Sequence, residues 1–358
     1  MSERAARLTE RLPDIGADLL LVTSLLNVRY LTGYTGSNGI ALVGPDTRVF
    51  VTDFRYTEQA AAEVEASFDR RISTLDLLEG VSDVLPASGP LRLGFEDAHL
   101  TVRGHERLRE LMPERVELVA AGDPVEALRA VKEPGEIAGI RAATEAADAA
   151  LRRVMEQGFA GRTEREVAVA LERAMQDLGA QRPSFDSIIA AGAHGALPHA
   201  QPRDVEIGAG ELVVVDWGAE LDGYCSDCTR TVATGELGAT AREVYELVLR
   251  AQLAGLEAVR AGVGGRDADA AARTLIEQAG HGERFGHGLG HGVGMEVHEA
   301  PRLSQRSDSV LEVGNVVTVE PGVYLPGEFG VRIEDLVVVT ESGCDILTAL
   351  PKELVTVG

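Results

Sequence analysis

Apolar residues in the first third of the chain fall in short runs separated by turn-rich segments. Residues 19–22 (Leu-Leu-Leu-Val) form one such run, which predicts a buried strand. Two further apolar runs, residues 40–43 and 48–52, lie on either side of Gly44-Pro45-Asp46 and predict a hairpin. A helical stretch follows the second run. Together these elements predict an α/β domain over residues 1–122.

Beyond Gly122 the apolar residues recur every three or four positions, which is the period of amphipathic helices. Pro134 and the capping box that begins at Thr163 each predict a helix start, and a third helix is expected from Thr240. β-like segments lie between these helices. The change of pattern predicts a second domain, of α+β class, over residues 123–358.

Two of the β-like segments share one pattern, in which an apolar run is followed by an acid and, two residues later, by glycine. The acid is Asp216 in the first segment and Glu320 in the second. A turn and another strand follow each segment, and these strands carry Asp227 and Glu334. The repeat suggests that the second domain is internally duplicated, although a match this short is equally compatible with chance.

Acids within apolar strands require something to neutralise them. An unpaired buried carboxylate is strongly destabilising, so such groups are paired or bind a metal unless they lie in solvent at strand ends. Solvent exposure is the commoner outcome for any single acid. Four acids in two matching hairpins make solvent exposure a much weaker explanation here, and favour acids that are paired or bind a metal.

Composition narrows the range of partners. The chain has 358 residues, 57 acidic and 34 basic side chains, and a formal net charge of −23. This balance argues against nucleic acid or an anionic membrane surface as a partner, because both are bound through basic residues. Lys132 and Lys352 are the only lysines, which we attribute to compositional bias towards arginine. Three cysteines cannot form a disulfide framework, so we expect a cytoplasmic location.

Histidine is concentrated in one part of the chain: six of the eight lie at positions 194, 199, 281, 287, 291 and 298. His287 and His291 have the spacing of a helical zinc pair, but the alternating glycines around them disfavour a helix. The same glycines fit an extended segment that places both rings on one side. The chain also lacks the His-Glu-x-x-His motif of helical zinc proteases and the Gly-Lys-Ser/Thr motif of phosphate loops.

Taken together, these motifs resemble those of the Xaa-Pro peptidases, aminopeptidase P and prolidase, within the pita-bread metallopeptidases. The resemblance covers nearly the whole chain. Its motifs are Asp216-Trp-Gly-Ala, Ser226-Asp227-x-Thr-Arg, His287-Gly-x-Gly-His291, His298-Glu, Glu320-Pro-Gly, Arg332-Ile-Glu334-Asp, Pro198-His199 and Thr52-Asp-x-Arg-Tyr56. The resemblance implies a C-terminal pita-bread domain, a duplicated α+β fold with a curved antiparallel sheet, preceded by a creatinase-type α/β domain.

The resemblance also implies a set of metal ligands. Two divalent metals would be held by Asp216, Asp227, His291, Glu320 and Glu334, with Asp227 and Glu334 bridging them. An oxygen-rich set with one imidazole favours Mn²⁺, with Co²⁺ and Zn²⁺ as alternatives.

Further roles follow from the same resemblance. A hydroxide that bridges the metals would attack the scissile carbonyl, and Glu320 would pass a proton to the proline nitrogen. His199 and His298 would bind the substrate and the oxyanion, and His287 would line the proline pocket. Arg332, together with Tyr324, would bind a substrate carboxylate. Plain packing is the alternative role for His287 and Tyr324.

The expected activity is hydrolysis of the Xaa-Pro bond in short proline-containing peptides by an Xaa-Pro dipeptidase. An Xaa-Pro aminopeptidase acting on longer peptides is the alternative, and a non-catalytic pita-bread binding protein is a remote one. Relatives commonly form dimers, so we expect a homodimer. His194 and His281 have no predicted role.

Overall fold

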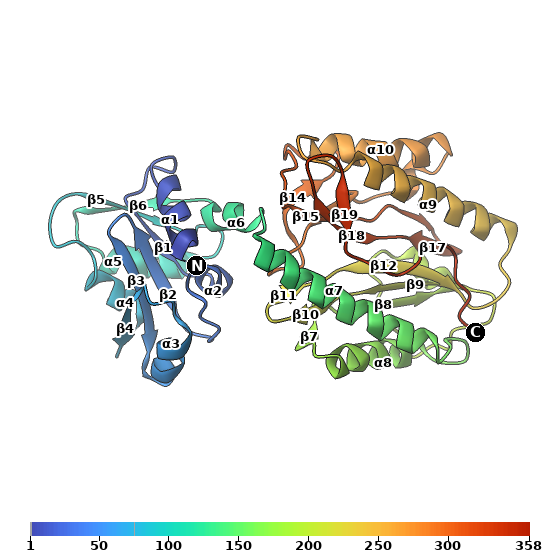
Figure 1. Ribbon diagram of the computed structural model, residues 1–358, viewed down its shortest axis with the longest axis horizontal. Coiled ribbons are helices and arrows are strands. Elements are labelled where there is room, and N and C mark those ends of the chain that lie inside the picture. The colour runs from blue at the N-terminus through green and yellow to red at the C-terminus, as the bar shows by residue number, and fades with distance from the viewer. Residues whose placement is uncertain (1, 75) are drawn as a thin grey trace. The chain divides into compact units, whose positions relative to one another are not determined.

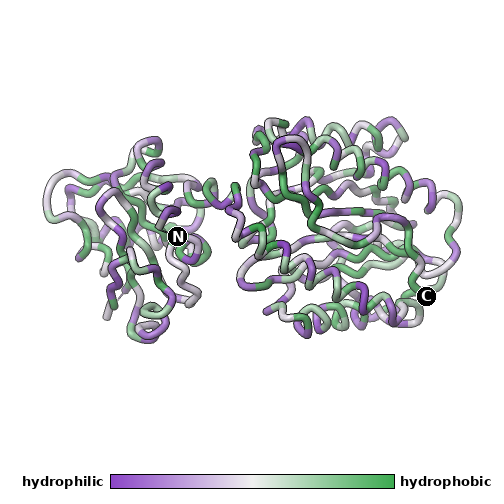
Figure 2. The backbone as a smooth tube through the Cα atoms, in the orientation of Figure 1, coloured by the Kyte–Doolittle hydropathy of each residue, from purple (hydrophilic) through white to green (hydrophobic). Residues whose placement is uncertain are grey.

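The computed structural model describes residues 2–74 and 76–358. The chain forms two compact units, Met1–Arg129 and Ala130–Gly358 (Figure 1). Each unit has its own apolar interior, to which the hydrophobic stretches of the strands contribute (Figure 2). In the described part of the chain, no helix is long and apolar enough to cross a membrane.

The units divide after Arg129 rather than after the predicted Gly122. The reason is helix α6 (Pro124–Arg129), which packs against helix α1 (Ser2–Arg11). Helix α6 buries apolar side chains in doing so, and Glu126 on α6 accepts a hydrogen bond from Asn27 at 2.5 Å. These contacts make α6 part of the first unit.

The first unit is built on the strands β1 (Leu19–Val22), β2 (Ile40–Gly44), β3 (Thr47–Asp53), β4 (Asp69–Ser73), β5 (Leu91–Phe95) and β6 (Val116–Ala120). They form one mixed sheet in the order β4-β3-β2-β1-β5-β6. The predicted hairpin is confirmed, because β2 and β3 pair antiparallel with Ile40 opposite Val51. Helices also belong to this unit, namely α2 (Leu25–Thr32), α3 (Thr57–Glu63), α4 (Leu77–Ser82) and α5 (Val102–Leu111).

The long helices of the second unit are α7 (Pro134–Met155), α8 (Glu164–Asp177), α9 (Ala239–Ala258) and α10 (Gly265–Gln278). The predicted capping box of α8 is confirmed, since the Thr163 hydroxyl accepts from the Glu166 amide at 3.1 Å and the Glu166 carboxylate accepts from the Thr163 amide at 2.8 Å. Helix α9 begins at Ala239, one residue before the predicted start, and its N-cap is Gly238.

Antiparallel strands lie between the helix pair α7–α8 and the helix pair α9–α10 (Figure 1). The first half of the second unit, which begins with α7 and α8, contributes β8 (Ile188–Ala191), β9 (Leu212–Trp217) and β12 (Cys228–Ala233). The second half contributes β13 (Gly290–Gly292), β14 (Glu299–Leu303), β15 (Val316–Val319), β18 (Asp335–Val339) and β19 (Cys344–Ile346). Smaller sheets are formed by β7 (Arg182–Pro183), β10 (Ala219–Leu221) and β11 (Tyr224–Cys225), and by β16 (Gly322–Leu325) and β17 (Phe329–Arg332).

Each half therefore repeats one order, two helices followed by antiparallel strands, as a duplicated α+β domain requires. Each half has a main hydrophobic core of its own, and a smaller cluster, which includes Ile140 and Val316, contains residues of both halves. In the core of the first half, Trp217 is fully buried and its indole N–H donates to the Ala147 carbonyl at 2.9 Å. The halves are joined between β12 and β18, where the Glu334 amide donates to the Thr229 carbonyl at 3.0 Å.

Candidate metal centre

The four acids singled out in the sequence occupy matching positions in the two halves. Asp216 is near the end of β9 and Glu320 directly follows β15. Asp227 directly precedes β12, and Glu334 directly precedes β18. Because β12 pairs with β9, and β18 pairs with β15, each antiparallel pair presents two acids at one end. All four acids line one cavity.

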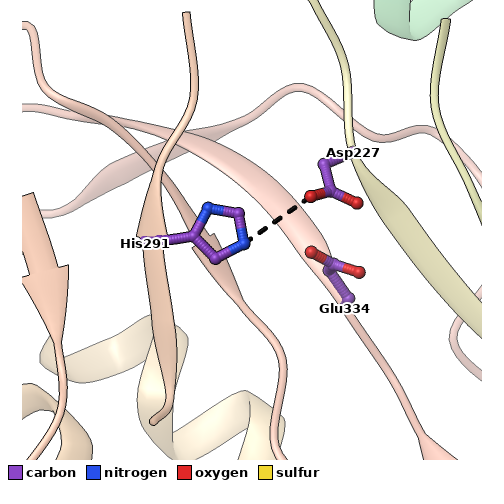
Figure 3. A group of neighbouring side chains, drawn as sticks. All are labelled: Asp227, His291 and Glu334. Carbon is purple, nitrogen blue, oxygen red and sulfur yellow. Dashed lines mark ion pairs between the residues drawn. The ribbon is translucent and has the colours of Figure 1, made fainter. Parts of the chain in front are cut away.

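The tightest group of ligand atoms is formed by Asp227, His291 and Glu334, which are buried and lie within 4.8 Å of one another (Figure 3). His291 Nε2 is 3.6 Å from Asp227 Oδ2 and 3.2 Å from Glu320 Oε1. Its other ring nitrogen, Nδ1, lies 3.1 Å from the Gly292 carbonyl. A carbonyl only accepts, so Nδ1 carries a proton and Nε2 faces the acids, the arrangement found in metal-binding histidines.

Two buried carboxylate oxygens of the four acids have no hydrogen-bond partner, Asp216 Oδ1 and Glu334 Oε1. The other oxygen of each is satisfied, because Arg332 donates to Asp216 Oδ2 at 2.5 Å and Thr229 donates to Glu334 Oε2 at 2.7 Å. A buried acceptor without a donor is destabilising unless a cation supplies the missing interaction. The donor set thus fits divalent cations.

The electrostatics of the acids point the same way. Burial raises the pKa of Asp227 and of Glu334 well above their usual range, and repulsion between neighbouring carboxylates raises both further. Burial also raises the pKa of Asp216. Burial acts in the same direction on Glu320, but the hydrogen bond and charge of His291 outweigh it and lower the pKa of Glu320 to about 2. Without cations, the cluster cannot hold all its acids ionised.

The cavity has a volume of about 510 Å³, which is within the range of pockets that enclose small ligands. His199, His287 and His298 line it together with the acids. The His298 ring centroid is 4.2 Å from that of His291. Burial, followed by the charge of His291, lowers the pKa of His298 to about 4, so His298 is neutral at pH 7.

Comparison with known proteins accounts for these features. Residues 138–341 match the model of Metallopeptidase family M24, and residues 4–131 match the Creatinase/Prolidase N-terminal domain. The chain belongs to metallopeptidase family M24. The expected family and fold are thus confirmed, and this M24 chain is an enzyme of the metallopeptidase class.

Relatives and solved structures match this M24 peptidase over nearly its full length. The Xaa-Pro dipeptidase of Pyrococcus furiosus is 37% identical over 359 residues, covering 99% of this chain and 100% of the relative. The structure of an Xaa-Pro dipeptidase from Bacillus anthracis has a TM-score of 0.95 at 40% identity, covering 99% of both chains. An X-Pro aminopeptidase from Thermotoga maritima has a TM-score of 0.90 at 38% identity, covering 98% of this chain and 99% of that one.

Arg332 lines the cavity but is held by neighbouring protein groups. Its guanidinium donates to Asp216 at 2.5 Å, to the Tyr324 hydroxyl at 2.9 Å, to the Pro198 carbonyl at 3.0 Å and to Thr229 at 2.9 Å. Tyr324 is the one predicted site residue outside the set of described residues that line the cavity. The structure thus links Arg332 and Tyr324 to the Asp216 carboxylate.

His287 and Tyr324 are brought into direct contact. The Tyr324 hydroxyl is 2.9 Å from His287 Nε2, and His287 Nδ1 is 2.8 Å from the Gly288 carbonyl. Because Nδ1 must donate to that carbonyl, Nε2 accepts a hydrogen bond from the Tyr324 hydroxyl. Burial lowers the pKa of His287, which keeps the ring neutral in this arrangement.

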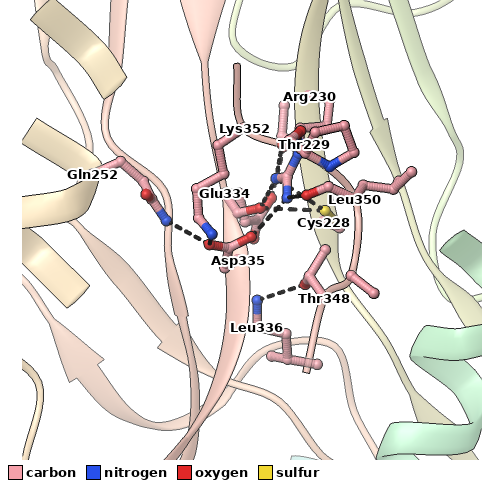
Figure 4. A network of polar contacts seen from close by, with 12 residues as sticks. Cys228, Thr229, Arg230, Gln252, Glu334, Asp335, Leu336, Thr348, Leu350 and Lys352 are labelled. Carbon is pink, nitrogen blue, oxygen red and sulfur yellow. Dashed lines mark hydrogen bonds and ion pairs between the residues drawn. The ribbon is translucent and has the colours of Figure 1, made fainter. Parts of the chain in front are cut away.

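Sequence reasoning missed a network of polar contacts next to the candidate metal ligand Glu334, centred on Asp335 (Figure 4). Arg230 Nη2 donates to Asp335 Oδ1 at 2.8 Å, while Lys352 Nζ and Gln252 Nε2 each lie 2.9 Å from Oδ2. Arg230 also donates to the Glu334 carbonyl. The network fixes the backbone beside Glu334. The only sign of this network in the sequence was Asp335 itself, an acid directly before an apolar run.

His194, which had no predicted role, supports the segment that carries His199. Its Nδ1 lies 2.9 Å from the buried Glu164 carboxylate. The same carboxylate accepts from the Ala191 amide at 3.0 Å and from Arg203 Nη2 at 3.0 Å. Glu164 therefore ties together both ends of the segment on either side of His199. His281 lies just after α10, where its amide donates to the Ile276 carbonyl at 3.0 Å.

Proposed function

We propose that this M24 peptidase is an Xaa-Pro dipeptidase that hydrolyses the Xaa-Pro bond of short proline-containing peptides. The observation that carries the proposal is the buried group of Asp227, His291 and Glu334, in a cavity that Asp216, Glu320 and three further histidines also line. Relatives named Xaa-Pro dipeptidase match nearly the whole chain and support it. The X-Pro aminopeptidase among the similar structures favours the alternative, cleavage of Xaa-Pro from longer peptides.

Asp216, Asp227, His291, Glu320 and Glu334 would hold two divalent cations, with Mn²⁺ as the proposed metal and Asp227 and Glu334 as the bridging ligands. Such cations polarise the scissile carbonyl and lower the pKa of the attacking water. Four carboxylates balance the charge of two dications, so the loaded site is close to neutral. The unpartnered oxygens of Asp216 and Glu334 support this assignment.

The chain's own groups carry the proton and orient the peptide. Glu320 is ionised, so it accepts a proton of the attacking water and passes it to the proline nitrogen as the carbon–nitrogen bond breaks. His298, which is neutral, and His199 donate hydrogen bonds to the substrate and to the developing oxyanion. His287 borders the space for the proline ring.

We place the substrate carboxylate on Arg302 rather than on Arg332. Arg332 is 3% exposed and its guanidinium is hydrogen-bonded within the protein, whereas Arg302 is exposed on the cavity wall. Arg302 was not among the residues expected from the sequence. Arg332 instead holds Asp216 in position.

A paired assay tests the proposal. Xaa-Pro dipeptides and the matching Xaa-Pro-Yaa tripeptides are supplied with Mn²⁺, Co²⁺ or Zn²⁺ in turn. We expect faster cleavage of dipeptides, with the highest rate in Mn²⁺. Faster cleavage of tripeptides would favour the aminopeptidase, and no cleavage of either peptide would favour a binding protein. Homodimer formation, tested by light scattering, and a cytoplasmic location remain predictions from the sequence.

A further inference from the structure

Both lysines of the chain lie in the second unit and pair with carboxylates. Lys352 Nζ is 2.9 Å from Asp335 Oδ2, and Lys132 Nζ is 3.1 Å from Glu299 Oε2. Each of these acids directly follows, in sequence, a residue that lines the cavity. Compositional bias explains why lysine is rare, but it does not explain this shared placement.

Lys132 is the more deeply buried of the two lysines. Its side chain is 1% exposed and that of Glu299 is 6% exposed, against 19% for Lys352. The Lys132 ammonium also donates to the Ala130 carbonyl at 3.3 Å, and its amide donates to the Gly314 carbonyl at 2.9 Å. Removing one partner of a buried ion pair is strongly destabilising, so Lys132 and Glu299 stabilise each other.

The Glu299 carboxylate also closes the loop that carries His298. Oε1 accepts from the Glu296 amide at 3.0 Å, while Oε2 faces Lys132. Gly294 packs closely against the same carboxylate, because a Cβ at this position would lie 2.5 Å from Oε2. The loop from Gly294 to Glu299 is thus folded around one carboxylate, whose charge Lys132 balances.

We propose that Lys132 is a positioning residue for His298. Acting through Glu299, Lys132 fixes the loop so that the His298 ring stays 4.2 Å from that of His291 and faces the substrate. Lys132 itself is not one of the described residues that line the cavity. The inference rests on the proposed function, in which His298 contacts the substrate.

A double-mutant cycle tests the proposal. Lys132→Met is made in the wild-type enzyme and in His298→Ala. In the wild type we expect kcat to fall roughly 10- to 100-fold, because small displacements of a substrate-binding group have effects of this size. KM and metal content should change by no more than about two-fold, and in His298→Ala the same substitution should change kcat by no more than about two-fold.

The outcomes separate the inference from the proposed function. An equal loss of kcat in both backgrounds would show a general structural effect and overturn the role of Lys132. Normal kcat in His298→Ala alone would overturn the proposed role of His298. Lys352→Met is the matched control: it removes the other paired lysine, and any loss it causes should be equal in both backgrounds.

A second measurement does not depend on activity or on tolerance of the buried methionine. In Glu299→Gln, which keeps the shape of the side chain, we expect faster amide hydrogen exchange across residues 293–299. Residues 191–203, which Glu164 holds, serve as the internal reference and should exchange at the wild-type rate. Unchanged exchange across residues 293–299 would contradict the proposal.

Discussion

The side chain of His291 is fixed in one tautomer by its own backbone. Because Nδ1 donates to the Gly292 carbonyl, Nε2 is the ring nitrogen that points at carboxylate oxygens 3.2 and 3.6 Å away. A lone pair and a carboxylate repel each other unless a proton or a metal ion lies between them. One hydrogen bond thus determines that Nε2 is the nitrogen through which His291 would bind the proposed metal.

Asp227→Asn removes one of the proposed bridging charges. We expect the variant to lose at least about 1000-fold in kcat, since the metal positions the reacting groups and stabilises the charge that develops. Metal analysis of the purified protein should show less bound Mn²⁺ than in the wild type. Near-normal turnover would contradict the ligand assignment.

The raised pKa values predict how the metal-free enzyme responds to pH. Asp227 and Glu334 have pKa values above 3.8 and 4.5 in the folded state, so the folded state holds protons that the unfolded chain has released. The stability that these groups contribute is therefore lost as the pH rises above those values. Urea unfolding in the presence of a chelator should show Asp227→Asn gaining stability over the wild type as the pH increases from 5 towards 8, roughly the span in which raised carboxyl pKa values fall.

Arg302→Met tests where the substrate carboxylate binds. We expect KM for an Xaa-Pro dipeptide to rise about ten-fold, the loss of one charge-assisted hydrogen bond, with little change in kcat. Arg302→Lys keeps the charge and should be less affected. If KM is unchanged in Arg302→Met, the carboxylate binds elsewhere.

At the scale of helices and strands, the capping box of α8 is a defined contribution to stability. Thr163→Ala removes the hydroxyl that accepts from the Glu166 amide. We expect the free energy of unfolding to fall by about 1 kcal/mol, as measured by urea titration. Thr163→Ser retains the acceptor and should lose less. Equal losses in the two variants would mean that the cap is not the cause.

The sequence predicted those elements that carry side-chain signals. The sequence predicted the start of α7 at Pro134, the capping box at Thr163 and the hairpin of the first unit. In each case the residues that end or begin the element are of types typical of helix caps or turns. The start of α10 was not predicted, since this helix follows a glycine N-cap, Gly264, that makes no side-chain hydrogen bond. The start of α9 was predicted one residue late, at Thr240, because its N-cap is also a glycine, Gly238.

The residues of the candidate site were likewise predicted only in part. Acids and histidines at characteristic spacing identified the group that lines the cavity. The partners of these residues could not be predicted, because they come from distant parts of the chain: Arg332 meets Asp216, and Lys132 meets Glu299, only once the second unit has folded. Arg332 in particular appeared to be available for substrate, since a sequence does not show which donors are already engaged.

At the scale of the whole second unit, the proposed ligand group draws on both halves of the duplicated domain. Asp216 and Asp227 come from the first half, whereas His291, Glu320 and Glu334 come from the second. Metal binding should therefore stabilise the unit as a whole. At a free Mn²⁺ concentration 100 times its Kd, we expect about 2.7 kcal/mol of added stability and a higher Tm in calorimetry. Asp227→Asn is the control and should respond less.

A cut in the turn before α9 would divide the second unit into its two halves. Each fragment would keep its own helix pair and most of its apolar interior, but neither would contain a complete set of ligands. The second fragment would also carry Val357, which packs in the core of the first. Turnover in a mixture of the fragments would then require their association, and the rate would be proportional to the concentration of the reassembled complex.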